Sequence, residues 1–219
     1  MKRILFFIVM TLCAMTTFAQ ETKEQIQKSE ERAKNLQILL DKYSDTNCGD
    51  GIIDGFGNSV RDAAVLAIAN SVKLEGLYYR QIGQTKDGVT DVTIVKPKLE
   101  DWTELLTTVT GEAASIKNAV DNAKAAGEQM KQIAENAKNN KNPMKMAKLA
   151  KMAKGAGVVM EFGNAATPIL LEESAEQIKA VQKIIETIKS GKNLYSQSSF
   201  CSCMAQTVMH RQKADLSLV

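Results

Sequence analysis

The longest regular hydrophobic pattern in the chain covers residues 97–139. Apolar or small residues recur there at alternating steps of four and three, which is the spacing of a coiled-coil seam. The seam positions are Trp102, Leu106, Val109, Ala113, Ile116, Val120, Ala123, Gly127, Met130, Ala134 and Ala137. About forty helical residues span roughly 60 Å at a rise of 1.5 Å per residue. The pattern therefore predicts one long helix that forms the spine of the fold.

Shorter stretches with helical periodicity flank this spine. Residues 21–43 and 59–82 each carry an apolar stripe, and residues 144–154 predict a short basic amphipathic helix. A last helix is expected from Thr167, because Pro168 suits a first turn and Gly191 suits a C-cap. The sequence thus predicts an all-α fold: an elongated, antiparallel, coiled-coil-like bundle of about five helices.

Three segments interrupt the helical pattern. Residues 44–58 are rich in Gly, Asp and Asn and predict a loop. Residues 83–96 contain a turn signal at Asp87-Gly88, followed by an alternating Val- and Thr-rich run. They predict a small extended or hairpin excursion. Residues 155–164 are glycine-rich without phosphate-loop spacing, and we expect a tight helix crossing or a bend there.

The first residues have the pattern of a secretory signal peptide. Lys2 and Arg3 precede an apolar run, and Thr17-Phe18-Ala19 places small residues where a signal peptidase cuts. This leader resembles Sec signals of Gram-negative bacteria. We predict a cleaved signal over residues 1–19, a helical bundle domain over residues 20–192, and a tail over residues 193–219. The tail contains Ser and Cys, and part of it could form a short helix. The mature protein is expected in the periplasm or outside the cell.

Three cysteines remain after the predicted cleavage: Cys48, Cys201 and Cys203. An oxidising compartment favours a disulfide, and the odd count leaves one thiol over. Cysteines separated by a single residue rarely satisfy disulfide geometry. We therefore expect Cys48 to pair with either Cys201 or Cys203, and the sequence leaves the choice open.

Oxygen-bearing side chains near Cys48 resemble a calcium loop. The candidate ligands are Asp45, Asn47, Asp50 and Asp54. The Gly expected at the sixth position of an EF-hand loop is displaced by one, and no Glu closes the loop. A turn followed by a helix cap is therefore the better interpretation. We expect no metal or other cofactor, and a metal-dependent binding module is only the third functional hypothesis.

The charges are balanced overall but unevenly distributed. The formal net charge is +3 for the whole chain, while residues 20–140 carry −4 and residues 141–219 carry +5. Lys145, Lys148, Lys151 and Lys154 lie in the predicted basic helix, and Lys141 lies in the turn just before it. This surface could face an acidic partner or an anionic membrane. Nucleic acid is not an expected partner of a nearly neutral, exported chain.

No constellation of residues in the sequence indicates catalysis. His210 is the only histidine, and it lies in the predicted tail. Hydrolytic or transfer chemistry needs a base beside a nucleophile, and no such pair stands out. The first hypothesis is a non-enzymatic protein that binds another protein or assembles with itself. The second is a membrane-active helical protein that binds lipid or forms pores.

Overall fold

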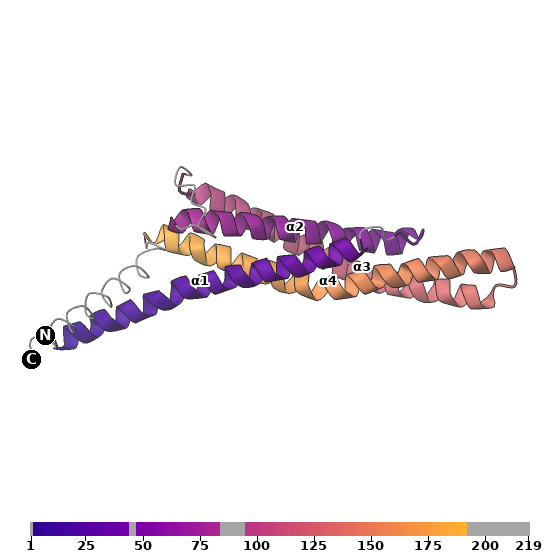
Figure 1. The fold of residues 1–219 in the computed structure, drawn as a ribbon, viewed down its shortest axis with the longest axis horizontal. Helices are drawn as coiled ribbons and strands as arrows, with labels where there is room; N and C mark the ends of the chain where they lie inside the picture. The colour runs from indigo at the N-terminus through magenta and orange to yellow at the C-terminus, as the bar shows by residue number, and fades with distance from the viewer. Residues whose placement is uncertain (1, 44–46, 84–94, 192–219) are drawn as a thin grey trace, which may run out of the picture.

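Four antiparallel helices make up the described part of the fold (Figure 1). The computed structural model describes residues 2–43, 47–83 and 95–191, with side chains from residue 21 onward. The helices are α1 (Lys2–Tyr43), α2 (Gly51–Ile82), α3 (Leu99–Asn139) and α4 (Pro143–Lys189). The described residues contain no strand. The predicted all-α, elongated bundle is therefore confirmed, with four helices in place of about five.

Some of the predicted features lie outside the described residues. They are most of the excursion expected near residues 83–96, and the cysteine-containing tail over residues 193–219. Both stay predictions. The helix α1 begins at Lys2 and so includes the predicted signal peptide. Cleavage after Ala19 is likewise untested and stays a prediction.

The helices α2 and α4 lie against each other across the middle of the bundle. The helices α1 and α3 each pack against both of them, on opposite sides of the α2–α4 pair. This arrangement leaves two hydrophobic clusters along the long axis. One cluster includes Leu36, Phe56 and Phe162, and the other includes Trp102, Leu74 and Ile184.

The predicted seam of α3 is confirmed at Trp102, Val109 and Ile116, which are buried. At five other seam positions the structure buries the residue one place earlier than predicted. The buried residues are Leu105, Glu112, Ala119, Ala126 and Ile133, in place of Leu106, Ala113, Val120, Gly127 and Ala134. A shift of one residue along an α-helix rotates the side chain by about 100° around the helix axis. The apolar Ala113 fits the seam better than Glu112 by hydrophobicity, but contact with both α2 and α4 buries the glutamate.

The helix α4 is continuous, which corrects the prediction of two helices separated by a glycine-rich crossing. Asn142 accepts hydrogen bonds from the N–H groups of Met144 and Lys145, and Pro143 occupies the first turn. Pro168 therefore lies inside the helix instead of at its start. Its missing N–H leaves the carbonyl of residue 164 without a helical donor. Both residues are on the exposed face, where water can hydrate that carbonyl.

The helix α2 also begins earlier than predicted, at Gly51 instead of near Ser59. Asp50 is its N-cap, and the Asp50 carboxylate accepts hydrogen bonds from the N–H groups of Ile52 and Ile53. An acidic N-cap satisfies two otherwise unpaired N–H groups and complements the positive helix end. The segment rich in Gly and Asp, which predicted a loop, thus contains the capped start of α2.

Glycines allow the close contact between α2 and α4. A Cβ atom at Gly163 would overlap the ring of Phe56, and one at Gly57 would lie 2.6 Å from Cγ1 of Val159. The predicted tight crossing in the glycine-rich segment is therefore present as a helix–helix contact. Gly157 belongs to the same segment but has no atom within 4 Å of its Cβ position.

The Gly163→Ala variant should destabilise the bundle. Its methyl group must displace the Phe56 ring, and overpacking of this kind costs roughly 1–3 kcal/mol. The matched Gly157→Ala variant should instead stabilise the fold by up to about 1 kcal/mol, because Ala is the better helix former. Urea denaturation followed by circular dichroism measures both changes. Equal effects of the two substitutions would contradict the proposed contact.

Candidate functional site

A layer of polar side chains crosses the interior of the bundle. Ser29 and Arg32 come from α1, Asn70 and Ser71 from α2, Glu112 from α3, and Glu173 and Gln177 from α4. On every helix these residues lie between the two hydrophobic clusters. On α3, for example, Val109 belongs to one cluster and Ile116 to the other. All four helices therefore contribute to one buried polar layer.

Glu173 is the most highly connected side chain of the polar layer. Its Oε2 atom accepts a hydrogen bond from Nε of Arg32 at 2.5 Å, and its Oε1 atom accepts from Nε2 of Gln177 at 2.6 Å. The hydroxyl of Ser29 also donates to Oε1 and lies 2.9 Å from the hydroxyl of Ser71. Burial raises the pKa of Glu173, and the bonds from Ser29 and Arg32 oppose that rise.

Glu112 has far fewer partners than Glu173. Its Oε2 atom accepts a hydrogen bond from Nδ2 of Asn70 at 2.6 Å, while its Oε1 atom is buried without a hydrogen-bond partner. The side chain is fully buried. Burial, and next the nearby carboxylate of Glu173, raise the pKa of Glu112 to about 7, against the opposing bond from Asn70.

Sequence reasoning missed both buried glutamates. Glu173 falls near the start of the helix expected from Thr167, where an exposed acid is ordinary, whereas α4 in fact begins at Pro143. A usable signal was present, because Glu112 is three residues after Val109 and four before Ile116. That spacing places Glu112 on the same face as two core residues. An acid on an apolar face is a candidate for burial once its neighbours are known to be buried.

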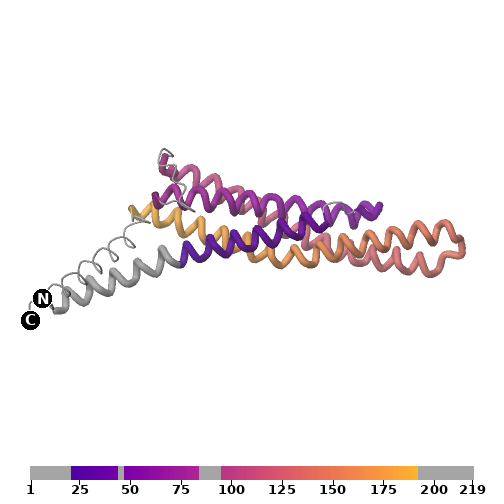
Figure 2. The backbone as a smooth tube through the Cα atoms, viewed as in Figure 1, coloured from indigo at the N-terminus to yellow at the C-terminus, as the bar shows by residue number. Residues whose placement is uncertain are grey.

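A two-helix hairpin projects beyond one end of the four-helix bundle (Figure 2). Nε2 of Gln129, on α3, donates to Oδ2 of Asp50 at 2.8 Å. On α4, a Cβ atom at Gly155 would lie 2.9 Å from Cα of Cys48. These contacts join α3 and α4 to the start of α2. Residues 130–154, hereafter the projecting hairpin, extend past them.

The predicted surface lysines all belong to the projecting hairpin. Lys141, Lys145, Lys148, Lys151 and Lys154 are exposed. The hairpin contains seven lysines and one acidic residue, so its net charge is +6. No ion pair joins these five lysines to another residue in the described part of the chain. The surface is therefore strongly positive and unneutralised by its own helices.

The apolar side chains of the projecting hairpin are divided between its interior and its tip. Leu149, Met152 and Ala153 are partly buried and pack against the adjoining hydrophobic cluster. Met144 and Met146, at the start of α4, are 84% and 43% exposed. Methionine is flexible and polarisable, which suits an adaptable contact surface. The tip thus combines positive charge with two exposed methionines.

The predicted calcium-loop residues have structural partners. Oδ1 of Asn47 accepts a hydrogen bond from the N–H of Gly49, and Asp50 caps α2. The carboxylate of Asp54 accepts from the N–H groups of Cys48 and Gly49 at 2.8 and 3.0 Å. Asp45 lies outside the described residues. Among the residues that are described, no group of three or more His, Cys, Asp or Glu side chains could hold a metal ion.

Of the three predicted disulfide residues, Cys48 alone lies in the described part of the chain. Cys48 is buried and its thiol is free. Cys201 and Cys203 lie outside the described residues, so their pairing with Cys48 stays a prediction. Burial raises the pKa of the Cys48 thiol to about 11, and the carboxylates of Asp54 and Asp50 add to that rise. Its thiolate is therefore scarce at neutral pH.

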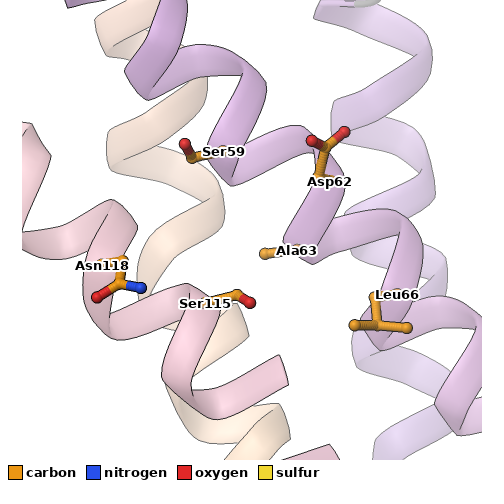
Figure 3. Close-up of a pocket in the computed structure, with 6 residues that line it drawn as sticks. All are labelled: Ser59, Asp62, Ala63, Leu66, Ser115 and Asn118. Carbon is orange, nitrogen blue, oxygen red and sulfur yellow. The ribbon is translucent and has the colours of Figure 1, made fainter. Parts of the chain in front are cut away.

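An open groove of about 270 Å³ lies between α2 and α3 (Figure 3). Its lining residues are Ser59, Asp62, Ala63, Leu66, Ser115 and Asn118. The hydroxyls of Ser59 and Ser115 donate to carbonyls of their own helices, so they are occupied. The groove offers few polar groups that converge on one point, which a specific small-molecule site requires.

Comparison with known proteins gives no match: no family model fits the sequence, and no curated protein or solved structure is significantly similar to it. None of the described helices is long and apolar enough to cross a membrane.

Removing the Glu173 carboxylate should strongly destabilise the protein. The Glu173→Ala variant leaves the partly buried Arg32 guanidinium with only the exposed Glu172 as a partner, and loss of one member of a buried pair costs up to roughly 3–5 kcal/mol. The neighbouring Glu172 also contacts Arg32, at 3.2 Å, but its side chain is 65% exposed. The matched Glu172→Ala variant should cost less than about 1 kcal/mol. Chemical denaturation of both variants tests this difference, and similar losses would contradict it.

Proposed function

We propose that this chain is an exported, non-enzymatic binding protein that presents the projecting hairpin to an acidic surface of a protein partner. The observation that carries the proposal is the position of the positive charge. Seven lysines are gathered on the part of the molecule that extends beyond the four-helix bundle. Opposite charge on a partner would speed association and align the two surfaces.

The shape of the hairpin supports a binding role. It is anchored at its base by Gln129, which contacts Asp50, and by Gly155, which packs on Cys48. The ten residues that follow Gln129, up to the end of α3 at Asn139, extend about 15 Å at the helical rise. A preformed surface loses little conformational entropy on binding. The four-helix bundle then serves as the support for this surface.

The distribution of apolar side chains favours a protein partner over a membrane. An interfacial helix needs an apolar face that can enter the lipid. In the projecting hairpin, Leu149 and Met152 are partly buried and pack against the hydrophobic cluster that includes Ile133. The exposed apolar groups are the two methionines at the tip, which fit a small contact on a protein. Binding to an anionic membrane surface is the alternative that the experiment must separate.

Reversing the charge of the hairpin should strongly weaken partner binding. The test variant carries Lys141→Glu, Lys145→Glu, Lys148→Glu and Lys151→Glu. The matched control carries Lys23→Glu, Lys28→Glu, Lys117→Glu and Lys124→Glu, which are exposed lysines of the four-helix bundle. Like charges facing each other cost several kcal/mol, so the test variant should lose more than about tenfold in affinity. The control should retain binding.

A photo-crosslinker at Met144, used in cells that export the protein, identifies the partner and the surface it contributes. The proposal requires that the crosslinked peptide of the partner has a net negative charge, and that purified partner binds less tightly as salt increases. Vesicles with 30% phosphatidylserine, compared with neutral vesicles, test the membrane alternative. Partner binding that survives charge reversal, or binding to anionic vesicles alone, would overturn the proposal.

A further inference from the structure

Glu112 is buried in a place that suits its neutral form. A buried carboxylate needs several donors to offset the loss of hydration, and Glu112 accepts one hydrogen bond, from Asn70. Its second oxygen has no partner. A protonated carboxyl would turn that oxygen into a donor. The amide oxygen of Gln177, in the same polar layer, is a buried acceptor without a partner.

The charged groups of the neighbouring helices also favour the neutral form. From α4, Glu173 faces Glu112 and contributes a second negative charge. From α2, the uncharged side chain of Asn70 donates to Glu112, while Lys73 on the surface pairs with Glu104. From α1, Arg32 is bonded to Glu173 and Glu172. The cation of the layer is thus committed to other carboxylates.

We propose that the polar layer is a pH-dependent latch, in which protonated Glu112 holds the middle of α3 against α2 and α4, and loss of its proton opens that contact. The device depends on geometry: one carboxyl with a single donor, a second carboxylate nearby, and no free cation among the described groups of the layer. It is independent of the binding role assigned to the projecting hairpin.

The expected direction with pH follows from the two states of Glu112. The ordinary glutamate pKa is 4.5 in the unfolded chain, and the pKa in the folded protein is about 7. Below pH 4.5 the Glu112 carboxyl is protonated in both the folded and the unfolded chain, so its burial does not lower the free energy of unfolding through ionisation. Between these values the folded state binds more protons than the unfolded state, so stability falls as pH rises. Above about pH 7 Glu112 is ionised in both states, and the loss of stability has reached its full size.

The opening should be local. On α3, Val109 and Trp102 are held in one hydrophobic cluster and Ile116 in the other, and both clusters persist when the layer opens. The affected amides are those within one turn of Glu112 and of Asn70. Regions with separate anchoring contacts can open independently of global unfolding.

Hydrogen exchange at pH 5.5 and 8.5 tests the latch, after correction for the intrinsic pH dependence of exchange. In the wild-type chain the protection factors over residues 109–116 should fall more than about tenfold between the two values, a change of 1.4 kcal/mol in opening free energy. The Glu112→Gln variant imitates the protonated form and should show little change. The matched Glu128→Gln variant, which removes an exposed carboxylate of the same helix, should behave like the wild type.

A second measurement uses the wild-type chain alone, so that a poorly folded variant cannot obscure the result. The side-chain carboxyl of ¹³C-labelled glutamate is followed by NMR as pH changes. One resonance should titrate with a midpoint near 7. The latch is overturned if every glutamate titrates near 4.5, if Glu112→Gln keeps the full pH dependence, or if protection falls equally along all four helices.

Discussion

The direct contact between α2 and α4 is the constraint on which the other packing in this bundle depends. Gly163 lies under the Phe56 ring and Gly57 under Val159, so these two helices approach closely and form the short diagonal of the bundle. The helices α1 and α3 are then accommodated on opposite sides of the pair. Glycine is costly within a helix, by about 1 kcal/mol relative to alanine. Here the close packing of Phe56 and Val159 offsets that cost.

The same arrangement brings polar residues of all four helices to one level. A bundle with an uninterrupted apolar core would be easier to stabilise, because burying Glu112, Glu173 and Arg32 costs several kcal/mol for each charge that is not well paired. Glu173 is well paired and Glu112 is not. This asymmetry makes Glu112 the sensitive member of the layer. The strongly charged projecting hairpin, in contrast, is far from the layer and remains hydrated.

Parts of the fold and of the candidate site followed from residue patterns. The stripe of α1, with Ile26, Leu36 and Tyr43, is buried as expected, because its apolar residues recur without competing polar ones. The exposed lysines of the hairpin were recognised because no acid accompanies them. In α3 and α4 the hydrophobic pattern did not identify which of two adjacent residues is buried. In α4, for example, Leu170 is buried whereas the adjacent Leu171 is 47% exposed, since periodicity alone tolerates a shift of one position.

By itself, the sequence determined the helical class, the length of α3, and the concentration of lysine near the α3–α4 turn. These properties depend on local spacing and composition, which each segment carries without its neighbours. Tertiary structure alone decided that α4 continues through Pro168, that Glu112 enters the core, and that the hairpin extends beyond the bundle. Each of these features depends on which helix packs against the segment, because a residue is buried only where a neighbouring helix covers it.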